Sequence, residues 1–256
     1  MRLFALSDLH VDYDANSRWV EALSLVDYSD DILVLAGDIS ASIERFERCI
    51  AQLVRRFKKL MFVPGNHDMW ITRTDQSTDS LAKFRKVCRI AEGNGALLNP
   101  YHLGQLSIVP LLSWYDFSFG APDDDLKSSW MDFHVCRWPD RWDMDDVTSH
   151  FLGMNNYRRR DGDEIIISFS HFLPRIDVIS NLVRGRHRSL FPVLGTTRLE
   201  RQIRELRSAV HIYGHSHINR NVPLDGTVYI NNAFGYPYET QLVGKSLRCV
   251  YEAALN

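Results

Sequence analysis

Short apolar runs alternate with helix-like patterns along the first hundred residues. Residues 3–7, 32–36 and 60–63 are mainly apolar runs whose length suits buried strands. Between the last two runs, apolar side chains recur every three or four residues, as on one face of an amphipathic helix: Ile43, Phe46, Ile50, Leu53, Val54 and Phe57. The same spacing returns at Leu81, Phe84, Cys88 and Ala91. Strands that alternate with helices in this way predict a fold of the α/β class.

The second half of the chain carries more strand patterns than helix patterns. Apolar runs predict further strands at residues 106–111, 164–169, 210–213, 227–230 and 247–251. The tetrapeptide Thr197-Arg198-Leu199-Glu200 has the spacing of a capping box, so it predicts the start of a helix. Because strands outnumber helices here, we expect a mixed sheet in this half.

A stretch rich in tryptophan and aspartate separates two of these predicted strands. Residues 114–142 hold four of the six tryptophans, and the stretch is far longer than the ~4–6 residues of a usual connection. It is either a lid or specificity loop over a site, or a surface excursion that buries its tryptophans in a small core of its own. We expect one domain over residues 1–256, with an inserted segment at about 114–160.

Composition excludes several classes of protein. Apolar residues make up 45% and charged residues 24%, as in ordinary globular proteins, and the net charge of −2 argues against nucleic acid or an anionic membrane as partner. The four cysteines include no CxxC pair and are expected to be free thiols in a reducing compartment. No apolar run reaches the ~18 residues of a membrane span, and residues 1–10 lack the pattern of a signal peptide. We expect a cytoplasmic location.

Five short segments concentrate aspartate, asparagine and histidine, and each directly follows a predicted strand. The segments are Asp8-Leu9-His10, Gly37-Asp38, Gly65-Asn66-His67-Asp68, Ser170-His171-Phe172 and Gly214-His215-Ser216-His217. In open α/β sheets, ligand sites gather at the carboxyl ends of the strands. Residues that are far apart in the sequence can therefore meet at one edge.

Carboxylates, an amide and imidazoles without cysteine suit divalent ions such as zinc, manganese, iron or nickel. Asp8 with His10, and His215 with His217, are pairs two residues apart that can point to the same side. The Asp38 carboxylate has two oxygens and can bridge two ions. Two ions ~3.5–4 Å apart can lower the pKa of a shared water from 15.7 to roughly 7, which gives a hydroxide nucleophile and a clamp for phosphate oxygens.

The order of these five blocks, from Asp8 to His217, resembles the calcineurin-like metallophosphoesterase superfamily. The resemblance implies a four-layer α-β-β-α sandwich of two mixed sheets flanked by helices. It also implies two divalent metal ions, with magnesium among the candidates. Gly-Asn-His-Asp and Gly-His-Ser-His in combination carry most of the resemblance.

The resemblance also implies a role for each residue. It assigns one ion to Asp8, His10 and His217, and the second ion to Asn66, His171 and His215, with Asp38 as the bridge. His67 is similar to a histidine of the family that is not a metal ligand. That histidine contacts the phosphate, and it protonates the leaving oxygen or stabilises the transition state. Asp68 is expected to hold a loop or a ligand in place. We expect the other histidines to be ordinary core or surface residues: His102, His134, His150, His187 and His211.

Differences from the motifs of two other branches indicate which branch of the superfamily the chain is similar to. Protein Ser/Thr phosphatases of this superfamily continue the second block as GDxxDRG, whereas this chain continues it as Gly37-Asp38-Ile39-Ser40-Ala41-Ser42. The UDP-diacylglucosamine hydrolases carry arginine at the position of His67. The chain is therefore similar to the phosphodiesterase-like branch, whose motif serves monoesters and diesters alike.

We therefore expect a two-metal phosphoesterase in which a metal-bridging hydroxide attacks a small phosphodiester or phosphomonoester, nucleotides included. A non-catalytic scaffold on the same fold and a nuclease are the alternatives. No membrane partner is expected, and the sequence makes no prediction of oligomeric state.

Overall fold

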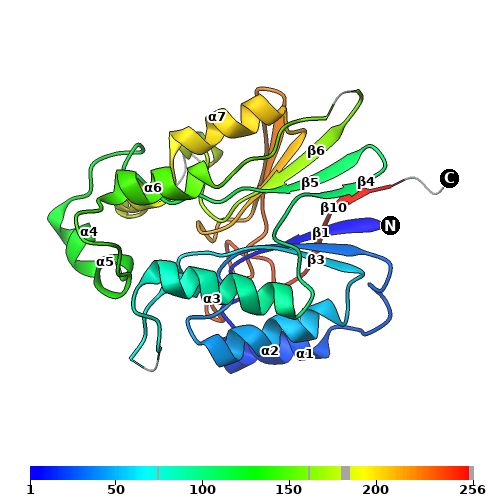
Figure 1. Ribbon diagram of the computed structural model, residues 1–256, viewed down its shortest axis with the longest axis horizontal. Coiled ribbons are helices and arrows are strands. Elements are labelled where there is room, and N and C mark those ends of the chain that lie inside the picture. The colour runs from blue at the N-terminus through cyan, green and yellow to red at the C-terminus, as the bar shows by residue number, and fades with distance from the viewer. Residues whose placement is uncertain (74, 161, 180–184, 254–256) are drawn as a thin grey trace.

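The computed structural model describes residues 1–73, 75–160, 162–179 and 185–253. Two sheets pack face to face between layers of helices (Figure 1). The first sheet has the order β10-β1-β2-β3, with β1 (Arg2–Leu6), β2 (Ile32–Ala36), β3 (Lys59–Val63) and β10 (Arg248–Glu252). Strands β1, β2 and β3 are parallel, and β10 is antiparallel to β1.

The second sheet is also mixed and has the order β4-β5-β6-β7-β9-β8. Its strands are β4 (Tyr101–Leu103), β5 (Leu106–Pro110), β6 (Ile165–Phe169), β7 (Val210–Tyr213), β8 (Arg220–Leu224) and β9 (Thr227–Asn231). The four inner strands run parallel, and β4 and β8 close the edges as antiparallel partners. The mixed sheet predicted for this half is confirmed.

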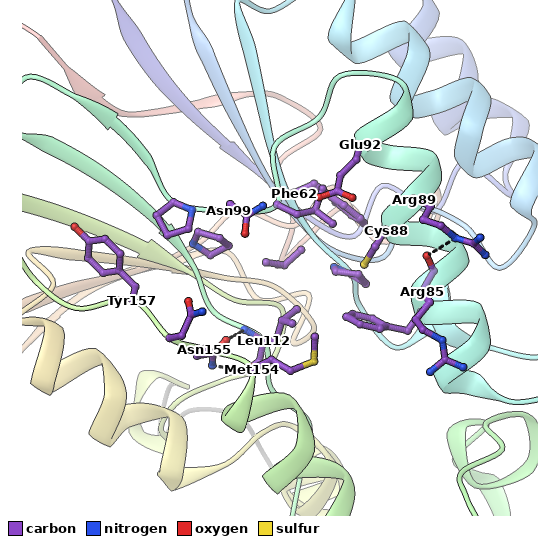
Figure 2. Close-up of a pocket in the computed structure, with 17 residues that line it drawn as sticks. Phe62, Arg85, Cys88, Arg89, Glu92, Asn99, Leu112, Met154, Asn155 and Tyr157 are labelled. Carbon is purple, nitrogen blue, oxygen red and sulfur yellow. Dashed lines mark hydrogen bonds between the residues drawn. The ribbon is translucent and has the colours of Figure 1, made fainter.

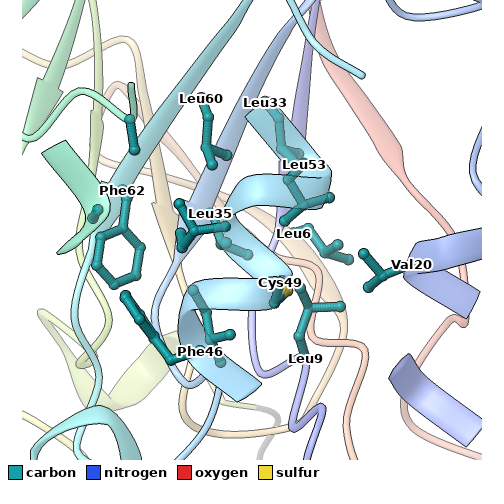
Figure 3. Close-up of a cluster of buried hydrophobic side chains, with 14 of the residues drawn as sticks. Leu6, Leu9, Val20, Leu33, Leu35, Phe46, Cys49, Leu53, Leu60 and Phe62 are labelled. Carbon is teal, nitrogen blue, oxygen red and sulfur yellow. The ribbon is translucent and has the colours of Figure 1, made fainter. Parts of the chain in front are cut away.

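Alternation along the strands divides the core into layers. In β1, Leu3 and Ala5 face the second sheet, whereas Phe4 and Leu6 face the helices, and all four are buried. A strand that is buried on both faces reads as a continuous apolar run, which is the pattern seen in the sequence. Figure 3 shows the helix-facing layer, where Leu33 and other strand side chains pack against side chains of a covering helix.

Helices cover the outer face of each sheet (Figure 1). The first sheet is covered by α1 (Asp14–Ala22), α2 (Ile43–Val54) and α3 (Ser80–Gly93). The second is covered by α6 (Met144–Gly153) and α7 (Thr197–Leu206). The predicted four-layer α-β-β-α fold class is confirmed. No helix among the described residues is long and apolar enough to cross a membrane.

The segment between β5 and β6 carries α6 and two shorter helices, α4 (Asp124–Ser129) and α5 (Asp132–Val135). Its aromatic side chains form a separate cluster with α3: Trp114 is completely buried, stacks on Tyr115 at 5.1 Å, and contacts Phe172 at 4.8 Å between ring centroids. The inserted residues are thus packed against the edge of the sandwich beside the carboxyl ends of its strands.

The helix predicted to start at Thr197 is confirmed as α7, but the predicted capping box is wrong, because the capping residue lies one position earlier. Helix α7 is capped by Thr196, whose hydroxyl accepts from the backbone N–H of Arg198 at 3.1 Å. Because the cap lies one residue earlier, Glu200 is the fourth residue of the helix and not the third, and its side chain instead accepts from the Tyr229 hydroxyl of β9 at 2.7 Å. A tertiary partner has therefore replaced the local one.

Candidate metal centre

Turns at the carboxyl ends of five parallel strands bring the predicted residues together. Five of these predicted residues have backbone angles in the left-handed region: Asp8 (φ 54°), His10 (42°), Asp38 (58°), His215 (65°) and His217 (51°). A non-glycine residue in this region is uncommon and costs about 1–3 kcal/mol, and such strain concentrates at functional sites. The turns re-aim side chains that an extended strand would direct into the two core layers.

The glycines of the motifs give these side chains room. A Cβ on Gly65 would lie 2.1 Å from Asp38 Oδ1, and a Cβ on Gly37 would lie 2.6 Å from His171 Nδ1. Both distances are well inside van der Waals contact. Glycine is therefore required at these two positions by the close approach of predicted ligands.

One group of donor atoms comes from Asp8, His10 and His217. His10 Nε2 lies 3.2 Å from His217 Nε2, which in turn lies 3.2 Å from Asp8 Oδ1. All three ligand atoms lie within 4.8 Å of one another. Burial opposes charge on both partners, but their ion pair holds the pKa of Asp8 below its usual value and raises the pKa of His217 to about 9. Two imidazoles and a carboxylate aimed at one point fit a divalent ion.

A second group comes from Asn66, His171 and His215. His171 Nε2 lies 3.0 Å from Asn66 Oδ1 and 3.1 Å from His215 Nδ1. The other ring nitrogens face backbone carbonyls, with His171 Nδ1 donating to Ala36 O at 2.8 Å and His215 Nε2 donating to Val193 O at 3.1 Å. These carbonyls fix the tautomers so that both lone pairs point into the cluster.

Asp38 lies between the two groups. Its Oδ2 is 4.0 Å from His10 Nε2 and 3.5 Å from His171 Nε2. Its Oδ1 accepts from the backbone N–H of His67 at 2.9 Å. Burial, followed by the nearby charges of Asp8 and Asp68, raises the pKa of this carboxyl well above its ordinary value. A buried acid that faces two sets of ligand atoms is the arrangement that a pair of cations would neutralise.

Asp68 ties the turn after β2 to the turn after β3. Its carboxylate accepts four backbone N–H groups, from Asp38, Ile39, Ser40 and Gly65, at 2.8–3.1 Å. Burial raises the pKa of Asp68 to about 6, although these four hydrogen bonds favour the charged form. The side chain thus holds the loops that carry Asp38 and Asn66.

His67 borders the cluster and is partly open to solvent. Its Nε2 lies 3.9 Å from Asp38 Oδ2, and its side chain is 15% exposed, against 1–2% for His10, His171 and Asp38. The ring stacks on Trp70 with 3.6 Å between centroids. Burial, together with the neighbouring imidazoles, lowers the pKa of His67 to about 3. His10, Asp38 and His67 also form a third possible ligand group, so the geometry allows His67 to bind an ion as well.

Residues that the sequence reasoning missed also contact the cluster. Glu239 Oε2 lies 2.7 Å from His217 Nδ1, and the ring of Tyr236 lies 4.5 Å from that of His10. Asp132 of the inserted segment accepts from the Asn66 amide at 2.9 Å. None of the three belongs to a motif, and no spacing in the sequence points to them.

The other described histidines lie outside the cluster. His211 is buried between the hydroxyls of Ser168 and Ser170 at 2.8 and 3.0 Å, and burial lowers its pKa to about 3. His102 bonds Ser107, and His134 contacts the carbonyl of Ser128. His150 packs beside Trp142 and Phe151. The side chain of His187 lies outside the described residues.

A cavity of about 580 Å³ lies away from the cluster, between α3 and the chain that follows α6 (Figure 2). Its lining is mainly apolar, with Phe62, Cys88 and Met154 facing the space, and the charged Arg85, Arg89 and Glu92 come from α3. Of the described residues that line it, none belongs to the two ligand groups. The chemistry of the cluster therefore does not extend into this cavity.

Comparison with known proteins gives four findings. A family model described as calcineurin-like phosphoesterase matches residues 1–219. An acyl-carrier-protein phosphodiesterase, PptH of Mycobacterium tuberculosis, is 26% identical over 93% of this chain and 78% of that protein. The crystal structure of a phosphopantetheinyl hydrolase (PptH) from the same organism aligns with a TM-score of 0.79 and 23% identity, over 99% of this chain and 98% of that one. Another solved structure aligns with a TM-score of 0.52 and 15% identity.

Proposed function

Because the chain belongs to the calcineurin-like phosphoesterase family and is a metal-dependent phosphoester hydrolase, we propose that its Asp/His cluster binds two divalent ions and cleaves a phosphodiester. The proposed ligands are Asp8, His10 and His217 for one ion and Asn66, His171 and His215 for the other, with Asp38 between them. The observation that carries the proposal is the position of Asp38 Oδ2, within 4.0 Å of one ligand group and 3.5 Å of the other. Manganese, iron, zinc, nickel and magnesium are the candidate ions.

Bound ions of this kind supply Lewis acidity and an activated water. The chain's own residues prepare the site for them. The carbonyls of Ala36 and Val193 hold His171 and His215 in the tautomers that ligate, and Asp68 fixes the loops that carry Asp38 and Asn66. The protein therefore presents its ligand atoms already oriented.

His67 is the proposed proton donor to the leaving oxygen. Its ring is held against Trp70, beside Asp38 and next to solvent, where a phosphate can approach. A bound phosphate anion favours the protonated imidazole, which opposes the lowering of its pKa in the free site. The stacking on Trp70 limits how the ring can turn, so the N–H is directed before substrate binds.

The substrate that we propose is a phosphodiester on a carrier protein rather than a small free phosphoester. The support is the relative described as an acyl-carrier-protein phosphodiesterase, which aligns over most of both chains. The alternative of a non-catalytic scaffold is disfavoured because a carboxylate, an amide oxygen or an imidazole stands at each position where the family pattern has a metal ligand, and these atoms lie close together. The nuclease alternative is disfavoured by the net charge of −2.

The test compares kcat/KM for three substrates: a carrier protein bearing phosphopantetheine, bis(p-nitrophenyl) phosphate and p-nitrophenyl phosphate. The protein is loaded with manganese, and a chelated sample is the control. We expect the carrier protein to be the best substrate, the aryl diester to exceed the aryl monoester, and chelation to abolish turnover of all three. Preference for the monoester would overturn the diester proposal, and turnover in the chelated sample would overturn the metal proposal.

A further inference from the structure

A buried carboxylate of the inserted segment contacts the proposed centre from outside. Asp132 begins α5 and is 3% exposed. Its Oδ1 accepts from Asn66 Nδ2 at 2.9 Å and from Trp70 Nε1 at 2.6 Å, and its Oδ2 accepts from Trp130 Nε1 at 2.9 Å. A carboxylate is tolerated inside a protein only when such donors compensate it, so these contacts are tightly constrained.

The contact with Asn66 sets which way its amide faces. A side-chain amide has a donor end and an acceptor end, and only the acceptor end can bind a cation. Because Asn66 Nδ2 donates to Asp132, Asn66 Oδ1 faces the cluster and lies 3.0 Å from His171 Nε2. The flipped amide would set its carbonyl oxygen against the carboxylate, with two acceptors in contact.

The same carboxylate holds two indole rings against histidines of the site. Trp70 stacks on His67 at 3.6 Å, and Trp130 meets His215 edge to face at 5.8 Å. Asp132 is the shared acceptor for both indole N–H groups. Asp132 thus contacts a proposed ligand directly, and reaches His67 and His215 only through the ring contacts of the two indoles.

We infer that Asp132 is a positioning residue that fixes Asn66 Oδ1 toward the second ion and links the inserted segment to the metal centre. The inference rests on the proposed function, in that Asn66 must be a ligand. Loss of Asp132 is therefore expected to weaken binding of the ion held by Asn66, His171 and His215. Binding of the ion held by Asp8, His10 and His217 is expected to be unchanged. The inserted segment therefore contributes to metal binding.

The test measures manganese binding and kcat for wild type, D132A and D132N. D132A removes both acceptors, and we expect affinity for one of the two ions to fall 10–100-fold, with a fall in kcat that excess manganese restores in part. D132N keeps one acceptor oxygen, and we expect a smaller loss of about 3–10-fold. If D132A does not fold, the manganese affinity of D132N alone tests the inference.

The matched control is D123A, in the same inserted segment. Asp123 caps α4 by accepting from the backbone N–H of Leu126 at 2.7 Å, and among the described residues no hydrogen bond or ion pair joins its side chain to the cluster. Its removal is expected to lower the melting temperature while leaving manganese affinity and kcat within twofold of wild type. A loss of metal in both D123A and D132A would mean that any damage to the inserted segment releases the ion. That result would overturn a specific role for Asp132.

A double-mutant cycle separates positioning from general damage. If Asp132 acts through Asn66, D132A adds less than a twofold loss of manganese affinity in the N66A background, because the oriented amide is already absent. Wild-type affinity in D132A, or losses that multiply in the double variant, would overturn the inference. The proposed function fails separately, if the wild-type chain itself binds no pair of ions.

Discussion

The carboxylate of Glu239 lies 2.7 Å from Nδ1 of His217, on the side of the ring away from the cluster. Glu239 also accepts from the backbone N–H of Tyr236 at 2.7 Å, so its position is fixed by the loop after β9. This pairing holds His217 with Nε2 toward Asp8, and it would make that nitrogen a stronger ligand for the proposed ion. The residue lies beyond the part of the chain that the family model matches.

We predict that E239Q lowers affinity for one ion about 10–100-fold while the other ion stays bound. The amide keeps the shape of the side chain but loses the charge that favours ligation by His217. Manganese titration followed by calorimetry measures the effect. E252Q in the exposed part of β10 is the control, with affinity expected at the wild-type level. Two ions bound to E239Q as tightly as to wild type would contradict the prediction.

H67A is predicted to retain its ions and to lose about 10²–10⁴-fold in kcat, the range attributed to a general acid. The imidazole lies at the rim of the cluster, so its removal leaves both proposed ligand sets intact. Metal content by atomic emission, measured beside kcat on bis(p-nitrophenyl) phosphate, checks this. Loss of an ion from H67A would identify His67 as a ligand instead.

G65A is predicted to displace the carboxylate of Asp38, the proposed bridge between the two ions. The added methyl would lie 2.1 Å from Asp38 Oδ1, closer than any real contact, so Asp38 or the turn must move. We expect turnover of the diester to fall at least 100-fold, together with weaker metal binding. G93A is the matched control, because a Cβ at Gly93 meets no atom within 4 Å. Wild-type turnover in G65A would show that Asp38 need not occupy this position.

Glu164 gives a prediction for stability that is independent of the metals. Although burial opposes its charge, hydrogen bonds from Ser107, Tyr157 and Arg160 lower the pKa of Glu164 to about 2. A group whose pKa is lower when folded stabilises the protein above its unfolded pKa of about 4.5, and that stability is lost as the pH falls toward 2.

E164Q is therefore predicted to reduce the free energy of unfolding at pH 7, with a difference from wild type that shrinks from pH 4.5 downward. Urea unfolding across this pH range measures it. The neighbouring D163N, at an exposed position, is expected to unfold like wild type at every pH. A difference for E164Q that stays constant down to pH 2 would show that the charge of Glu164 is not the cause.

The strands and the edge that they share could be predicted from the sequence for a physical reason. β1, β2 and β3 are buried on both faces, so they appear as unbroken apolar runs. Parallel strands end at one edge, so the polar segments that follow them had to meet there. The convergence of Asp8 with His217, more than two hundred residues apart, follows from these two facts.

The sequences of β4, β8 and α1 lack such a pattern of apolar residues. β8 alternates between half-buried and exposed residues and contains Pro223, as an edge strand can, and β4 has only three residues. α1 is mostly polar and buries little beyond Asn16 and Val20. Local patterns of burial are therefore too weak to identify these elements.

Asp132 and Glu239 were missed for a different reason. Each acts through one hydrogen bond to a proposed ligand, and its distance from that ligand is set by packing of remote segments. The sequence of the inserted segment is compatible both with a lid over a site and with a surface excursion that has a small core of its own. Its buried Trp114 lies in an aromatic cluster with α3, while Asp132 of the same segment contacts Asn66.

The most direct test of the two-ion account compares D38N with wild type, by counting bound manganese ions and measuring kcat/KM for a phosphodiester. We predict two ions per chain in wild type and at least a tenfold loss of kcat/KM in D38N, since removing even a residue that only supports a metal ligand costs 10–100-fold. D38N is expected to keep the wild-type fold by circular dichroism. D38N that retains more than about 10% of wild-type activity with both ions bound would contradict the bridging role of Asp38.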